Sequence, residues 1–239
     1  MVTPPASDVA ALAAARERVL GAIADAAARA GRDPAGITLV AVSKTVPAER
    51  LRAAVAAGLT VLGENRVQEA EAKAALVPGA TWHLVGPLQS NKAKRALATF
   101  SMIESVDSVD LARRLDRLAG EVLPTGARLP VLLQVNVDAD PAKAGFEPAA
   151  LERSVAELDA FDALEVRGLM TVGRLVDDAE AARPSFVALR ALSERLRGQW
   201  PGLGPELSMG MSDDYPVAIE EGATTVRVGR ALFGARDRG

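Results

Sequence analysis

Short apolar runs recur along the chain and alternate with segments whose apolar residues have helical spacing. The first run covers residues 37–42, in which four side chains are aliphatic and none is charged. Such a run is typical of a strand that is buried on both faces of a parallel sheet. Seven further runs predict strands at residues 60–62, 81–85, 102–105, 130–137, 164–171, 206–208 and 225–228.

Helical patterns fill the intervals between these strands, and one more helix precedes the first strand and ends at Gly31. Eight strand-then-helix units, the last followed only by a short tail, predict a single-domain α/β fold, a (β/α)8 TIM barrel over residues 1–239. The extra N-terminal helix lies outside this repeat, and we expect residues 1–8 to be flexible. An open doubly wound sheet would also alternate, but no G-x-G-x-x-G follows the first strand.

The composition and charge of the chain exclude several kinds of partner and site. With 28 basic and 31 acidic residues, the chain has no overall basic field, which argues against nucleic acid or an anionic membrane as a partner. It has no cysteine, which excludes disulfides and thiolate metal sites, and a single histidine, which excludes a cluster of histidine ligands. No apolar run is long enough to span a bilayer, and we expect a cytoplasmic protein.

Lys44 ends the first apolar run and is the leading candidate for chemistry. A lysine at the end of a buried strand can lose solvation, which lowers its pKa towards the neutral amine that attacks carbonyl groups. The functional interpretation is therefore a lysine that forms a Schiff base. The alternative is a lysine whose charged end simply reaches solvent, and the strand end alone favours this alternative.

A barrel places its chemistry at the C-terminal ends of the strands and commonly binds phosphate in the loops after strands seven and eight. After the seventh predicted strand, Ser208, Gly210 and Ser212 lie in one short loop, and Gly229 follows the eighth strand. These residues predict a phosphate site. Plain capping of the next helix by Asp213 or Asp214 is the alternative.

Six motifs at these strand ends follow one another in the order and spacing of a known family. Each is weak alone, but together they resemble the pyridoxal phosphate homeostasis proteins (the YggS/PROSC type) over nearly the whole chain. They are Ala41-Val-Ser-Lys-Thr45; Gly63-Glu-Asn65 with Val67-Gln-Glu69; Trp82-His83 with Gly86-Pro-Leu-Gln-Ser-Asn-Lys92; Gly168-Leu-Met170; Ser208-Met-Gly-Met-Ser-Asp-Asp214; and Val226-Arg-Val-Gly229 with Phe233-Gly234.

The resemblance implies a barrel like the N-terminal domain of alanine racemase, with pyridoxal 5′-phosphate (PLP) bound to Lys44 as a Schiff base. No metal and no catalytic residue is implied. The further cofactor contacts that it implies are Ser208, Gly210, Ser212, Gly229 and Arg230 with the phosphate, Arg227 with the pyridine nitrogen, and Asn65 and Met209 with the walls.

Several positions depart from the family pattern. Val46 stands where many members have a second lysine, and Arg66 stands where a tyrosine is common. Arg230 replaces a threonine or serine, so it either adds a charged contact to the phosphate or points to solvent. His83 either lines the pocket or is a satisfied structural group. Lys143 is either a secondary PLP acceptor or a surface lysine, and we favour the surface lysine.

Two functions remain. The first is a non-catalytic, monomeric PLP-binding protein that takes part in vitamin B6 homeostasis by storing, buffering or delivering PLP to apoenzymes. The second is a PLP-dependent amino-acid racemase with Lys44 as one base. Racemases need an opposing acid or base, supplied by a tyrosine of a second domain from a partner subunit. The sole tyrosine here, Tyr215, is expected on the phosphate side, so we favour the binding protein.

Overall fold

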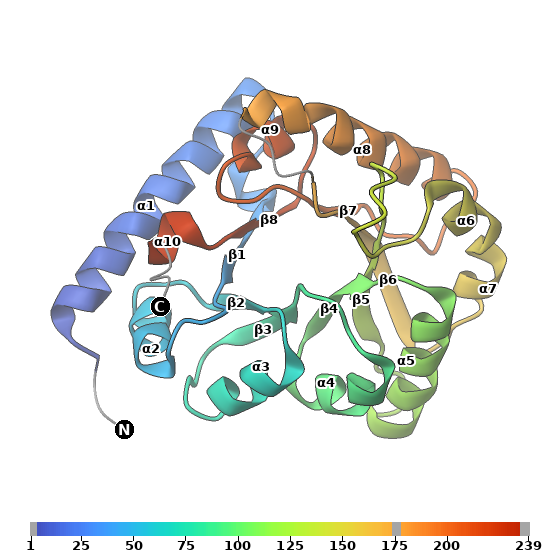
Figure 1. The fold of residues 1–239 in the computed structure, drawn as a ribbon, viewed down its shortest axis with the longest axis horizontal. Helices are drawn as coiled ribbons and strands as arrows, with labels where there is room; N and C mark the ends of the chain where they lie inside the picture. Colours follow the sequence, from blue (N-terminus) through green and yellow to red (C-terminus); the bar gives the residue numbers. More distant parts are fainter. Residues whose placement is uncertain (1–3, 174–177, 235–239) are drawn as a thin grey trace.

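A closed barrel of eight parallel strands forms the centre of the computed structural model, which describes residues 4–173 and 178–234 (Figure 1). The strands follow one another in chain order, and β1 closes the barrel by pairing with β8. The predicted (β/α)8 barrel is thereby confirmed. The strands are β1 (Thr38–Val42), β2 (Val61–Glu64), β3 (Thr81–Leu84), β4 (Met102–Val106), β5 (Leu129–Gln134), β6 (Leu164–Met170), β7 (Glu206–Ser208) and β8 (Thr225–Val228).

Helices surround this barrel, and the extra helix α1 runs along its outside against α2, α9 and α10 (Figure 1). Within the described part of the chain, no helix is long and apolar enough to cross a membrane. The helices are α1 (Ala6–Arg29), α2 (Ala48–Ala56), α3 (Val67–Ala74), α4 (Ala93–Thr99), α5 (Val109–Val122), α6 (Pro148–Arg153), α7 (Val155–Asp159), α8 (Arg183–Arg197), α9 (Tyr215–Glu220) and α10 (Arg230–Phe233).

Three details differ from the sequence prediction. The sequence pattern predicts one helix that opens at Glu147-Pro148 and ends at Leu158, but the structure has two helices, α6 and α7, which meet at Ser154. The Ser154 hydroxyl and N–H both donate to the carbonyl oxygen of Ala150, at 2.9 Å and 3.2 Å. The chain after β8 forms the short helix α10 and not only a tail. Of the segment expected to be flexible, residues 1–3 lie outside the described residues, and α1 already begins at Ala6.

The hydrophobic core has two parts because side chains alternate across each strand. The larger part packs the outer face of the barrel against the helices, including the buried face of α1 with Leu12, Val19 and Ile23. A smaller separate cluster is formed by Met102, Leu132 and Met170. The polar side chains of the candidate site lie at the C-terminal ends of the strands and in the loops that follow them.

Candidate functional site

Lys44 lies just beyond the C-terminal end of β1, at the mouth of the barrel. Strand β1 ends at Val42, and Lys44 lies in the turn that follows it. Val42 in turn lies close to Gly229 after β8, where an added Cβ would be 3.3 Å from the Val42 carbonyl oxygen. The half-buried Lys44 lines a cavity of about 400 Å³ together with Val42, Gly229 and Arg230. The predicted amine and the loop after strand eight therefore share one cavity.

The backbone on both sides of Lys44 is bonded to side chains of α3. Thr45 has a φ of 68°, a left-handed conformation that costs a non-glycine residue about 1–3 kcal/mol. Its N–H donates to Glu69 Oε1 at 2.7 Å, and the carbonyl oxygen of Ser43 accepts a hydrogen bond from Lys73 Nζ at 2.9 Å. Helix α3 thus holds the turn that carries Lys44.

A buried ion pair lies behind this turn. Lys73 Nζ lies 2.6 Å from Glu64 Oε1 and 2.7 Å from Glu69 Oε1, and the Glu64 side chain is 0% exposed. The Ser43 hydroxyl donates to the same Glu64 oxygen at 2.8 Å, while Glu64 Oε2 is buried with no hydrogen-bond partner among the described residues. Burial raises the pKa of Glu64, although the hydrogen bond and charge of Lys73 oppose the rise.

Burial would also raise the pKa of Glu69, but hydrogen bonds from Lys73 and from the Thr45 amide bring this pKa below its usual range. Glu69 therefore stays a charged acceptor near neutral pH. We call Ser43, Glu64, Glu69 and Lys73 the α3 clamp.

The loops after β7 and β8 meet at Ser212 and Gly229, because the Gly229 N–H donates to Ser212 Oγ at 3.2 Å. Gly229 directly precedes α10, and the first amides of a helix have no acceptor within the helix. These two loops are the ones that commonly bind phosphate in a (β/α)8 barrel.

Two residues fix the shape of the loop after β7. Gly210 has a φ of 92°, and an added Cβ would lie 2.6 Å from the Cβ of Ala218, so this position requires glycine. The buried Asp214 accepts a hydrogen bond from the Met211 N–H at 2.6 Å, and burial raises the pKa of Asp214. Asp214 thus ties the loop to the start of α9.

A chain of polar side chains connects β8, β7, β4 and β3. Arg227 donates to Ser208 Oγ at 2.5 Å and to the carbonyl oxygen of Thr171 at 2.6 Å. Ser208 Oγ donates to Glu104 Oε2 at 2.6 Å, and the other oxygen of Glu104 lies 2.7 Å from His83 Nδ1. Each of these four side chains therefore contacts at least one other member of the chain.

The chain also sets the charges of its members. Burial would raise the pKa of Glu104, but the hydrogen bond and charge of His83, the charge of Arg227 and the Ser208 hydroxyl together lower it. Burial lowers the pKa of Arg227, and the charges of Glu104 and Asp214 oppose this change. A buried carboxylate and a buried guanidinium therefore stabilise each other through Ser208.

The structure brings some of the predicted site residues together. Lys44, Gly229 and Arg230 line one cavity, and Ser212 contacts Gly229. Ser208 and Arg227 are buried and bonded to each other, so the Ser208 hydroxyl is already engaged by two side chains. The proposed contacts of these residues with a cofactor remain predictions.

The other predicted site residues have the following surroundings. Asn65 packs its backbone against Gly86, where an added Cβ would lie 2.7 Å from the Asn65 Cα. Met209 is fully buried in the large hydrophobic cluster. Arg230 forms an ion pair with Asp213 at the surface, with both side chains more than half exposed.

Lys143 is not the surface lysine that we favoured from the sequence. Its side chain is 21% exposed, and its Nζ lies 3.6 Å from carboxylate oxygens of both Asp138 and Asp140. The Nζ atom itself is buried. Asp138 and Asp140 belong to the same polar loop, and their carboxylates let the Lys143 ammonium be buried there.

Sequence reasoning missed the α3 clamp and the role of Glu104. The helix after β2 is polar apart from Val67 and three alanines, so its sequence did not distinguish an inward-facing Lys73 from an exposed lysine. Glu104 did carry a signal, since a carboxylate inside an otherwise apolar strand needs a partner when it is buried.

Comparisons with known proteins agree with the motifs. Residues 20–237 match the family model described as alanine racemase, N-terminal domain. The chain is 44% identical over 225 residues to a pyridoxal phosphate homeostasis protein of Pseudomonas aeruginosa, with 93% of this chain and 94% of that protein covered. A protein of the same name from Escherichia coli K12 is 40% identical over 224 residues, with 90% and 92% covered.

Solved structures give the same picture. PipY of Synechococcus elongatus PCC7942, determined with PLP bound, is 45% identical, with a TM-score of 0.78 and coverage of 89% of this chain and 100% of PipY. Alanine racemase of Bartonella henselae shares the fold at 18% identity and a TM-score of 0.69, and 59% of its chain is covered. The chain therefore belongs to the pyridoxal phosphate homeostasis protein family and has the fold of the alanine racemase N-terminal domain.

Proposed function

We propose that this protein binds PLP covalently through Lys44 and acts as a carrier of the cofactor without catalysing a reaction of its own. The observation that carries the proposal is the shared cavity, which the half-buried Lys44 lines together with Gly229 and Arg230. PLP supplies an aldehyde that condenses with a lysine amine with loss of water. PipY, a relative with 45% identity, was determined with PLP bound.

The residues around the cavity suit the two ends of such a cofactor. Ser212, Gly229 and the start of α10 would hold the phosphate, because hydroxyl and backbone amide groups gather there. Arg230 can leave its exposed partner Asp213 at little cost and add a charged contact.

Arg227 would face the pyridine nitrogen. A guanidinium has five N–H groups, and Arg227 uses one for Ser208 and one for Thr171, so further donors remain. Because a guanidinium donates and does not accept, it would keep the ring nitrogen unprotonated. The bound cofactor would then be a weaker electron sink than one whose ring nitrogen is paired with a carboxylate.

Racemisation requires a second acid or base, and the two side chains best suited to this role support the carrier by their positions. The only tyrosine, Tyr215, is buried in the large hydrophobic cluster, and burial raises its pKa. The only histidine, His83, is paired with Glu104. Neither residue lines the Lys44 cavity.

The carrier function predicts how the protein binds PLP and how it passes PLP on. PLP added to the purified protein produces a saturable change in its absorption spectrum, and Lys44→Ala abolishes this change without altering the unfolding midpoint. The matched control Lys94→Ala, at an exposed position of α4, binds like the wild type. The loaded protein restores activity to a PLP-dependent apoenzyme but does not racemise amino acids. Full binding by Lys44→Ala would refute the site, and sustained racemisation would refute the non-catalytic part.

A further inference from the structure

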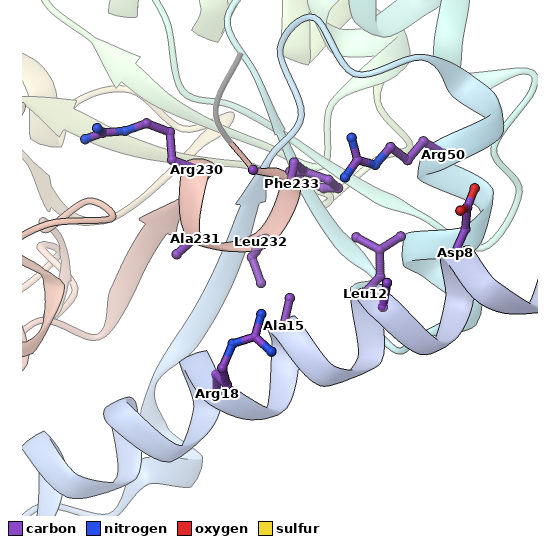
Figure 2. A pocket seen from close by; sticks show the side chains of 11 residues that line it. Asp8, Leu12, Ala15, Arg18, Arg50, Arg230, Ala231, Leu232 and Phe233 are labelled. Atoms are coloured by element: carbon purple, nitrogen blue, oxygen red, sulfur yellow. The ribbon is translucent and has the colours of Figure 1, made fainter. Parts of the chain in front are cut away.

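A second cavity lies between α1, α2 and α10, next to the Lys44 cavity (Figure 2). Its volume is about 560 Å³, within the range of pockets that hold small molecules. Its floor is apolar, because Leu12 and Ala15 of α1 and Leu232 and Phe233 of α10 are buried there. We call it the outer cavity. Of the residues that line it, only Arg230 has a part in the proposed binding of PLP to Lys44.

Two arginines on different helices point into the outer cavity. Figure 2 shows the guanidinium of Arg18 beside Ala15 and Leu232, and that of Arg50 beside Phe233. Within the described part of the chain, neither arginine forms a salt bridge, whereas Arg230 is paired with Asp213 and points away from the cavity. Asp8 is the single carboxylate of the lining, so the cavity has a net positive charge.

We propose that the outer cavity binds a small anion that carries an apolar ring, such as an aryl phosphate. The anionic group would accept charge-assisted hydrogen bonds from Arg18 and Arg50, whose forked donors match phosphate and carboxylate. The ring would cover the apolar floor at Phe233 and remove it from water. An apolar floor alone would fit any hydrophobic ligand, and arginines alone any anion. The combination selects molecules with both features.

The position of Arg50 links the two cavities. Both the outer cavity and the Lys44 cavity are lined by Arg50, Arg230, Phe233 and Gly234. An anion in the outer cavity would therefore lie directly beside the site that we propose for PLP. The binding of this second ligand goes beyond the carrier function and does not depend on it.

Phenyl phosphate is a suitable probe, and isothermal titration of the full chain is the assay. The titration is done on protein treated with excess PLP and borohydride, so that a site at Lys44 is already blocked. We expect saturable binding that the double variant Arg18→Gln/Arg50→Gln weakens about tenfold or more. The matched control Arg117→Gln/Arg197→Gln removes the same charge at exposed positions of α5 and α8 and should bind like the wild type.

A second variant tests the cavity without changing charge. Ala11 lies exposed on the cavity wall, so Ala11→Phe would fill the space and should abolish binding. The proposal is overturned if phenyl phosphate does not bind, if the control double variant loses as much affinity as the cavity variant, or if inorganic phosphate binds as tightly. Failure of PLP to label Lys44 would refute the carrier function but leave this result interpretable, because Ala11 and Arg18 line the outer cavity and do not line the Lys44 cavity.

Discussion

Removal of the Lys73 ammonium is the sharpest perturbation of the α3 clamp. Lys73→Met keeps most of the side-chain volume but leaves Glu64 without its cation, at a position where the carboxylate is 0% exposed. Loss of one partner of a buried ion pair costs about 3–5 kcal/mol of unfolding free energy. We expect a value near the lower end, roughly 3 kcal/mol at pH 8, because the buried carboxylate can take up a proton instead of remaining charged. For a chain of this size, that loss lowers the melting temperature by about 6–12 °C.

The pH dependence of this loss identifies its cause. Burial already raises the pKa of Glu64, and removal of Lys73 takes away the charge that opposes the rise. A carboxyl group with a raised pKa in the folded state retains its full stability at low pH, where it is protonated, and loses it as the pH rises through that pKa. The deficit relative to the wild type should therefore be small near pH 5 and should grow towards about pH 8.

Urea denaturation at several pH values measures this difference. Lys94→Met, at an exposed position of the neighbouring helix α4, is the matched control and should change the unfolding free energy by less than about 0.5 kcal/mol. A Lys73→Met protein as stable as the wild type at pH 8 would refute the reasoning, and so would a deficit that does not change with pH.

Two further substitutions test other parts of the site. The pKa of Glu104 lies below its usual value, so its contribution to stability is complete above about pH 4.3 and is lost as the pH falls further. Glu104→Gln should lower the unfolding free energy at pH 7 and flatten its decline in acid, and denaturation curves parallel to the wild type would contradict this. Gly210→Ala should cost about 2–3 kcal/mol because of its φ of 92° and the contact with Ala218, whereas Gly36→Ala, with open space around it, should cost much less. Equal costs in urea denaturation would exclude this explanation.

The fold was predictable because its signals are local. Each strand is a short apolar run, and the order of strands in a (β/α)8 barrel follows the order of the chain. The break at Ser154 was not predictable from periodicity, because the apolar spacing of Leu151, Val155 and Leu158 continues across it.

The site was predictable only in part. Lys44 stood out because a charge ends an apolar strand, and the loops at Ser212 and Gly229 followed from the rule for barrel mouths. The α3 clamp depends on how α3 packs against the ends of β1 and β2, which a sequence pattern does not contain. Lys73 and an exposed lysine of a polar helix look the same until the neighbouring strand is in place.

The α3 clamp orders the backbone that carries Lys44. A flexible lysine at a barrel mouth would have to be ordered each time it bound a cofactor, which costs conformational entropy. Here the turn at Thr45 is held in a strained conformation by Glu69, and Ser43 is held by Lys73. The backbone that presents Lys44 is thus ordered before any ligand arrives.

The most direct test of the central claim is to identify the residue that PLP labels. The purified wild-type protein is incubated with PLP, reduced with borohydride, digested and mapped by mass spectrometry. The account predicts the label on the peptide that contains Lys44, at one equivalent per chain, with the other lysines unmodified. A label mainly on another lysine, or none at Lys44, would contradict it.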